Sequence, residues 1–167
     1  KKNFSNLKFK KVPNILGVLN LTPDSFSDGG KFNTKQRGIS HAIKLYNDGA
    51  DLIDVGGEST RPGALPVTLN QELARILPPI AGLVRDNIRI SVDTRHAAVM
   101  TRATAAGASI INDVGGLRGD GAMAAAAASG APVVIMHMQG MSETMQQRPS
   151  YNFAPIDIYA VSYTHLT

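Results

Sequence analysis

Polar side chains of the kinds that bind anions and metal ions gather in two short segments. Residues 20–30 read NLTPDSFSDGG and follow the apolar run 15–19, and residues 56–63 read GGESTRPG and follow the apolar run 52–55. A short continuous apolar run is typical of a buried parallel strand. Because ligands bind at the carboxyl ends of such strands, both segments are expected to be site loops.

Other ligand-type residues follow the later apolar runs in the same way. Together with those of the two loops, the residues of this kind at the strand ends are Asn20, Glu58, Ser59, Thr60, Arg61, Asp93, Thr94, Arg95, Asn112, Asp113 and His137. A guanidinium can bind phosphate with two parallel hydrogen bonds, so Arg61 has the character of an anion clamp. A carboxylate such as Asp93 at the edge of a buried strand needs a partner or a ligand, because unpaired burial is costly.

Plainer interpretations exist for single residues of this set. Asn20 could close a turn, and the amide of Asn112 could satisfy loop backbone. Arg95 could form a structural ion pair with Asp93, two residues earlier. For His137, an imidazole tied to backbone is favoured over a catalyst.

Composition sets the broad class. The chain has 167 residues, 43% of them hydrophobic, with a net charge of +4 and no cysteine. No apolar run approaches the ~18 residues of a membrane span, and the basic residues 1–11 lack the features of a signal peptide. We therefore expect a cytoplasmic protein without disulfides or thiolate metal sites. The basic residues are scattered and not interleaved with aromatics, which argues against a nucleic-acid partner, and the missing apolar span argues against a membrane.

Helical patterns separate the apolar runs. The first is expected to be capped by Thr34, the second to kink or break at Pro78 and Pro79, and two more to cover residues 96–106 and 122–128. Strands separated by helices run parallel, which fits either an open doubly wound sheet or a (β/α)8 barrel. The first strand lacks a G-x-G-x-x-G turn, which favours the barrel. A complete barrel needs about 250 residues, so an incomplete one is expected, with about five strands and four helices.

Several familiar chemistries are excluded because their motifs are absent. The sequence contains no G-x-S-x-G, no G-x-x-x-x-G-K-[ST], and no H-E-x-x-H. The polar set instead suits a partly anionic small molecule. Mg²⁺ is plausible through Asn20, since this ion accepts oxygen ligands together with substrate phosphates.

These motifs resemble those of the dihydropteroate synthase family. The two loops already quoted match its first two loops, and SVDT at 91–94, INDV at 111–114 and MHMQG at 136–140 match its later segments. The resemblance runs from about residue 15 to about residue 159. It implies a (β/α)8 barrel that joins 6-hydroxymethyl-7,8-dihydropterin diphosphate to p-aminobenzoate in folate biosynthesis, with Mg²⁺. It also implies a transferase that sulfonamides target and that usually forms homodimers.

The resemblance assigns roles residue by residue. Asn20 would bind the metal, Thr60 and Arg61 the diphosphate, and Asp93, Asn112 and Met136 the pterin. Asp93 and Arg61 would be the catalytic pair, because a carboxylate can stabilise positive charge on the pterin methylene while a cation neutralises the leaving group. The pocket for p-aminobenzoate would be shaped by Thr22, Pro23, Phe26 and Pro62.

The sequence also departs from the family. No segment matches the family's later pterin-binding Asp, its Lys or its Arg-x-His pair, so the isolated chain is expected to be inactive. Residues 1–160 are interpreted as the N-terminal part of a pterin-binding barrel, and residues 161–167 as a tail that resembles a translated sequencing adapter. The alternatives are a methyltetrahydrofolate-type methyltransferase, against which Arg61 and its neighbours argue, and a non-catalytic pterin-binding module.

Overall fold

Strands and helices alternate along the chain. The structure, a computed structural model, describes residues 13–22, 31–59, 66–139 and 150–158. Its elements, in chain order, are β1 (Leu16–Asn20), α1 (Lys31–Asn47), β2 (Leu52–Gly56), α2 (Leu69–Arg85), β3 (Ile90–Asp93), α3 (Ala97–Ala105), β4 (Ile110–Asp113), α4 (Ala122–Ser129) and β5 (Val133–Ile135). The expected series of βα units is confirmed.

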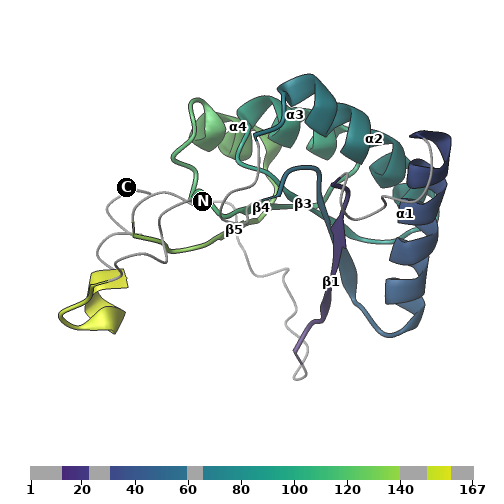
Figure 1. Cartoon of the computed structure of the whole chain (residues 1–167). Helices are drawn as coiled ribbons and strands as arrows, with labels where there is room; N and C mark the ends of the chain where they lie inside the picture. Colours follow the sequence, from purple (N-terminus) through teal and green to yellow (C-terminus); the bar gives the residue numbers. More distant parts are fainter. Residues whose placement is uncertain (1–12, 23–30, 60–65, 140–149, 159–167) are drawn as a thin grey trace.

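The five described strands form one sheet in the order β1-β2-β3-β4-β5, and every pairing is parallel. Helices α1 to α4 lie along one face of this sheet, and a short helical segment at residues 154–158 lies apart from it (Figure 1). A doubly wound sheet reverses its strand order at a switch point and carries helices on both faces. A sequential order with the helices on one side is instead the arrangement of a (β/α)8 barrel.

The hydrophobic core lies between the sheet and these helices. On the strands it contains Leu19, Val55, Val92 and Ile111, and on the helices Ile76, Ile80, Leu83, Val99 and Met100, all of them fully buried. Successive side chains of a strand point to opposite faces, so the residues between these core positions face away from the helices. On β1 that second face is open, since Leu16 and Val18 are 42% and 54% exposed.

Helix α2 runs through Pro78 and Pro79 without interruption, so the expected helix break is wrong. The helix is held on both sides of the prolines, because Ile76 and Ile80 are fully buried against the sheet. Its start is fixed by a capping box, in which the side chain of Thr68 accepts from the backbone N–H of Gln71 and Gln71 reaches back to the N–H of Thr68. Packing and capping together outweigh the two backbone donors that the prolines lack.

Helix α1 begins at Lys31, so Thr34 lies inside its first turn and is not its N-cap. The cost of a threonine within a helix is below about 1 kcal/mol, which does not prevent three residues from extending the helix toward the N-terminus. The other two helices were predicted more closely. Helix α3 starts after His96, and α4 lies between Gly121 and Gly130, both of which have left-handed backbone.

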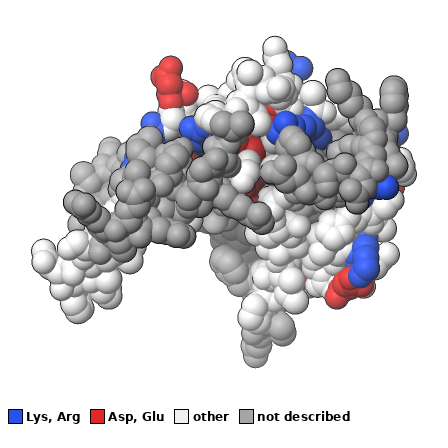
Figure 2. All heavy atoms as spheres, in the orientation of Figure 1, with Lys and Arg blue, Asp and Glu red and all other residues white. Residues whose placement is uncertain are grey.

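The described surface carries no dominant charged patch on the face shown in Figure 2, where basic side chains are scattered and one of them lies directly against an acidic side chain. Among the described residues, no helix has the length and apolar character that crossing a membrane would require.

Candidate active site

Three polar side chains form a row at the carboxyl ends of the strands. The strand register places Asn20 beside Gly56, Gly56 beside Asp93, and Asp93 beside Asn112. Paired residues of neighbouring strands point to the same face of a sheet, and here that is the face away from the helices. The sequence prediction that residues far apart in the chain meet at this edge is therefore supported for Asn20, Asp93 and Asn112.

The row is open at Gly56. A Cβ atom placed there would lie 3.4 Å from Oδ2 of Asp93 and 3.6 Å from Oδ1 of Asn20. Two oxygen atoms from different strands therefore border a space that only a glycine leaves free. Oxygen donors of this kind suit a hard divalent cation or the polar groups of a ligand.

Asp54 lies one pleat below the row and was not singled out from the sequence. Its Oδ2 accepts a hydrogen bond of 3.0 Å from Nδ2 of Asn112, although β3 lies between the two strands. Asp54 is 4% exposed, and its Oδ1 is buried and accepts no hydrogen bond from any described residue. The available signal was a carboxylate inside the apolar run 52–55.

The carboxyl group of Asp93 is electrostatically unusual. Its burial, together with the negative charges of Asp54, Asp113 and two glutamates, raises the pKa of Asp93 from 3.8 to about 7. The alternative that Arg95 pairs with Asp93 is wrong, because Arg95 binds Glu58. Asp93 is thus poised between its protonated and ionised forms at neutral pH, and a cationic ligand would favour the ionised form.

Glu58 joins the loop after β2 to the loop after β3. Its two carboxylate oxygens accept from Nε and Nη2 of Arg95 over 2.9 and 3.0 Å, and one of them also accepts from the backbone N–H of Val67 over 3.3 Å. Burial alone would raise the pKa of Glu58, but the hydrogen bonds and charge of Arg95 outweigh it and hold the pKa below its ordinary value. Glu58 is therefore expected to remain ionised and paired.

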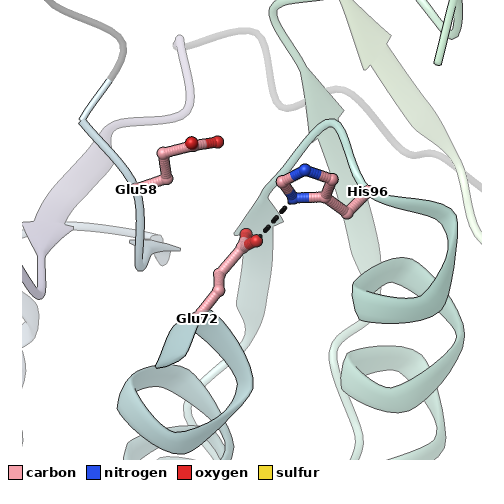
Figure 3. Close-up of side chains that lie close together, drawn as sticks. All are labelled: Glu58, Glu72 and His96. Carbon is pink, nitrogen blue, oxygen red and sulfur yellow. Dashed lines mark hydrogen bonds and ion pairs between the residues drawn. The ribbon is translucent and has the colours of Figure 1, made fainter. Parts of the chain in front are cut away.

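A second carboxylate, Glu72 of α2, is fully buried beneath the site. It accepts from Oγ1 of Thr94 and contacts Nδ1 of His96, both over 2.7 Å. Figure 3 shows Glu72 pointing from the start of α2 toward His96 at the start of α3, with Glu58 turned toward the same region. No local pattern in the sequence signals this contact, because it joins the starts of two different helices, 24 positions apart.

Glu58, Glu72 and His96 lie close enough together to be compared with a metal site, since one ligand atom from each falls within 4.8 Å of the others. Their lone pairs are already used, however. Both oxygens of Glu72 have partners in Thr94 and His96, and Arg95 neutralises Glu58. The group is better explained as a clamp that fixes the ends of β2 and β3.

Asp113 differs from its neighbour Asn112. It is fully buried, and it accepts from the backbone N–H groups of Gly115 over 2.6 Å and of Leu117 over 2.8 Å. The turn it holds is tight, with positive φ at Gly116 and Leu117. Asp113 thus shapes the loop after β4, and Asn112 is the residue of the pair that faces the site.

The remaining described candidates lie at the same edge of the sheet. Thr22 is half-buried two residues after β1, and Met136 follows β5 and is 37% exposed. His137 packs its ring on Tyr151 with centroids 5.8 Å apart, and its Nε2 is buried without a partner rather than tied to backbone. Five predicted site residues lie outside the described residues: Pro23, Phe26, Thr60, Arg61 and Pro62.

Comparison with known proteins identifies similar sequences. The family model for pterin binding enzymes matches residues 16–159. The dihydropteroate synthase of Escherichia coli (strain K12) is 47% identical over 152 residues, which cover 89% of this chain and 54% of that protein. The dihydropteroate synthase of Bacillus subtilis (strain 168) is 47% identical over 135 residues, covering 80% and 47%. The chain therefore spans about half the length of the curated relatives it matches.

Solved structures give the same result for the fold. The Yersinia pestis dihydropteroate synthase with a sulfonamide drug complex superposes with a TM-score of 0.83 at 46% identity, covering 92% of this chain and 56% of that one. The Burkholderia cenocepacia dihydropteroate synthase complexed with 7,8-dihydropteroate superposes with a TM-score of 0.79 at 39% identity, covering 92% and 52%. These neighbours are (β/α)8 barrels, so the expected fold class is confirmed.

Proposed function

The chain belongs to the family of pterin-binding enzymes, and we propose that its strand ends form the substrate-binding part of a dihydropteroate synthase. The observation that carries the proposal is the row Asn20, Gly56, Asp93 and Asn112 on the open face of the sheet. In the proposed reaction the C–O bond between the pterin methylene and the diphosphate breaks, and diphosphate leaves with the electron pair. The amine of p-aminobenzoate then forms the C–N bond and loses a proton.

Asp93 is the catalytic residue of the proposal on the pterin side. Departure of diphosphate leaves positive charge on the pterin methylene, and an ionised carboxylate nearby stabilises that charge. The pKa of about 7 supports this role, because positive charge developing next to Asp93 favours the form without the proton. The reaction needs no nucleophilic protein side chain, in agreement with the motifs that the sequence lacks.

The pterin ring is proposed to lie over β3 and β4. Asn112 offers an amide beside Asp93, and Met136 offers an apolar, polarisable side chain at the end of β5. Donors and acceptors on the edge of a heterocycle pair with such groups, whereas its flat faces need apolar contact.

Mg²⁺ is proposed to be held by Asn20, next to the space that Gly56 leaves open. Amide and carboxylate oxygens fit this ion, which usually keeps several waters and is completed by substrate phosphates. When bound, it would neutralise charge on the leaving diphosphate. Thr60 and Arg61 are proposed to bind that diphosphate, while Thr22, Pro23, Phe26 and Pro62 are proposed to shape the p-aminobenzoate pocket.

Calorimetric titration of the 167-residue chain with 6-hydroxymethyl-7,8-dihydropterin diphosphate and Mg²⁺ tests the proposal. We expect saturable binding that Asp93→Ala weakens about tenfold or more, because it removes a charged partner of the ligand. Asp86→Asn is the matched control, since Asp86 is exposed at the opposite end of α2 from the site. Absence of binding to a folded chain, or an Asp93→Ala variant with unchanged affinity for the ligand, would contradict the proposal.

A further inference from the structure

The hydrogen bond between Asp54 and Asn112 fixes which end of the Asn112 amide is free. A carboxylate is an acceptor only, so the group facing it must be the amide nitrogen. The 3.0 Å contact from Nδ2 of Asn112 to Oδ2 of Asp54 has this polarity. The carbonyl Oδ1 of Asn112 is consequently the end of the amide that remains available to a ligand.

The local packing makes this arrangement specific. The hydrogen bond crosses β3 next to Ser91, the register partner of Asp54, and Ser91 is a small residue that is 1% exposed. A larger side chain at that position would occupy the space between the two partners. Asp54 itself is 4% exposed. If the hydrogen bond to Asn112 broke, bulk water could not readily replace it, and the buried carboxylate oxygen would be left without a donor.

A second observation concerns the other carboxylate oxygen of Asp54. Its Oδ1 is buried and unpaired among the described residues, whereas Asp113 uses both oxygens on backbone N–H groups. A buried acceptor without a donor costs about 1–3 kcal/mol. This corner of the site therefore holds a buried acceptor, Oδ1 of Asp54, whose hydrogen bonding a molecule that brings N–H groups would complete.

From these contacts we propose that Asp54 is a specificity-determining positioning residue. By holding Nδ2 of Asn112 it turns Oδ1 of Asn112 toward the ligand, so the site selects heterocycles that present an N–H donor, such as an exocyclic amine, and rejects those with an oxygen there. This inference rests on the proposed function, since it concerns how the pterin edge is recognised. It adds a residue that does not itself belong to the row.

A pair of small ligands measures the selection directly. 6-Hydroxymethylpterin and 6-hydroxymethyllumazine differ in having an amine or an oxygen at ring position 2. We expect the chain to bind the pterin about tenfold more tightly or better, because the oxygen would face an acceptor. In Asp54→Asn, residue 54 can also donate a hydrogen bond, so the Asn112 amide can rotate by about 180° and present its NH₂ group to the ligand. The preference for the pterin over the lumazine should then fall to about onefold or reverse.

Two variants separate positioning from a merely structural role. In the double variant Asp54→Asn with Asn112→Asp, residue 54 donates to residue 112, which still offers its second oxygen, so the pterin preference should return. Asp86→Asn, exposed and distant, should keep the preference of the unaltered chain. Retention of the full preference by Asp54→Asn, or no recovery in a folded double variant, would overturn the inference.

A readout without ligand keeps this test distinct from that of the proposed function. If neither compound binds, the proposed function has failed, and solvent exchange of the Asn112 side-chain amide protons, followed by NMR, decides the positioning claim. Protection should drop about tenfold or more in Asp54→Ala, as expected for loss of a buried hydrogen bond. Unchanged exchange in that variant overturns the positioning role. Faster exchange supports it.

Discussion

Arg95 donates two hydrogen bonds to the carboxylate of Glu58, from Nε over 2.9 Å and from Nη2 over 3.0 Å. The pair links the loops that follow β2 and β3. It also leaves Asp93, two residues before Arg95, without a cation among its described contacts. Arg95 helps to hold the pKa of Glu58 below its ordinary value, whereas burial and neighbouring negative charges raise the pKa of Asp93.

The Arg95–Glu58 pair should contribute measurably to stability. A double-mutant cycle with Arg95→Met and Glu58→Gln is expected to give a coupling free energy of about 1 kcal/mol, since the pair is bidentate but half-exposed. Because the pKa of Glu58 is lowered on folding, its contribution is present above its ordinary value of 4.5 and is lost as the pH falls through the lower folded value. Urea unfolding at pH 7 and pH 3 measures this, and a coupling that is equal at both pH values would contradict the assignment.

Asp93 should make stability fall as the pH rises. Its pKa is 3.8 in the ordinary state and about 7 in the folded chain, so between these values the folded chain keeps a proton that the unfolded chain releases. The loss is at most about 4 kcal/mol and levels off above neutral pH. Asp93→Asn removes it, so this variant should gain stability relative to the unaltered chain between pH 4 and pH 8. Thermal unfolding across that range checks the sign, with Asp86→Asn as the control that should follow the unaltered chain.

The hydroxyl of Thr94 should contribute more to the free energy of unfolding than the exposed hydroxyl of Thr101. Thr94→Val removes the donor to the fully buried Glu72 and is expected to lower the free energy of unfolding by about 1–3 kcal/mol. Thr101 of α3 is the matched control, because its hydroxyl is exposed and donates only to the carbonyl of Ala97. Thr101→Val should change stability by less than about 0.5 kcal/mol. Equal effects of the two substitutions in urea unfolding would count against the clamp around Glu72.

Substitution of the neighbouring residues Gly56 and Gly57 should have different effects, on ligand binding and on stability respectively. A Cβ at Gly57 would lie 2.9 Å from Cγ of Glu72 and 2.9 Å from Cγ2 of Ile76, and Glu72 cannot move without losing its hydrogen bonds. Gly57→Ala should therefore destabilise the fold by about 1–3 kcal/mol.

At Gly56 the nearest atoms are at ordinary contact distance, so Gly56→Ala should fold normally. Its methyl group, however, would occupy the space between Asn20 and Asp93 and should weaken binding of the diphosphate ligand with Mg²⁺. Unfolding and calorimetry together distinguish the two glycines. A Gly56→Ala chain that binds as well as the unaltered chain would show that this space is not used.

The sequence predicted the parts of the fold that depend on local pattern. Short apolar runs located the strands, and the polar residues after them located the ends of the row, as with Asn20 and Asn112. It could not assign partners that depend on the distance between loops. The alternative of an ion pair between Arg95 and Asp93 rested on their closeness in the chain, whereas the carboxylate that Arg95 binds is Glu58, 37 positions away.

Residues inside elements were also hard to judge. Asp54 was predicted only as part of an apolar strand, because hydrophobic periodicity and composition do not show which face of a buried strand carries a charged side chain. Pro78 and Pro79 predicted a break that α2 does not have, since the packing of Ile76 and Ile80 on the sheet is not visible in local propensity.

The strand register also fixes the distance between Asn20 and Asn112 across the sheet. Neighbouring strands lie roughly 4.8 Å apart, so the three steps from Asn20 to Asn112 measure about 14 Å along the sheet. The backbone positions of Asn20 and Asn112 are thereby held at a fixed separation by backbone hydrogen bonds, which side-chain motion cannot alter. A ligand that contacts both Asn20 and Asn112 must match that length, so under the proposed function the sheet would favour an extended pterin diphosphate over a bare pterin.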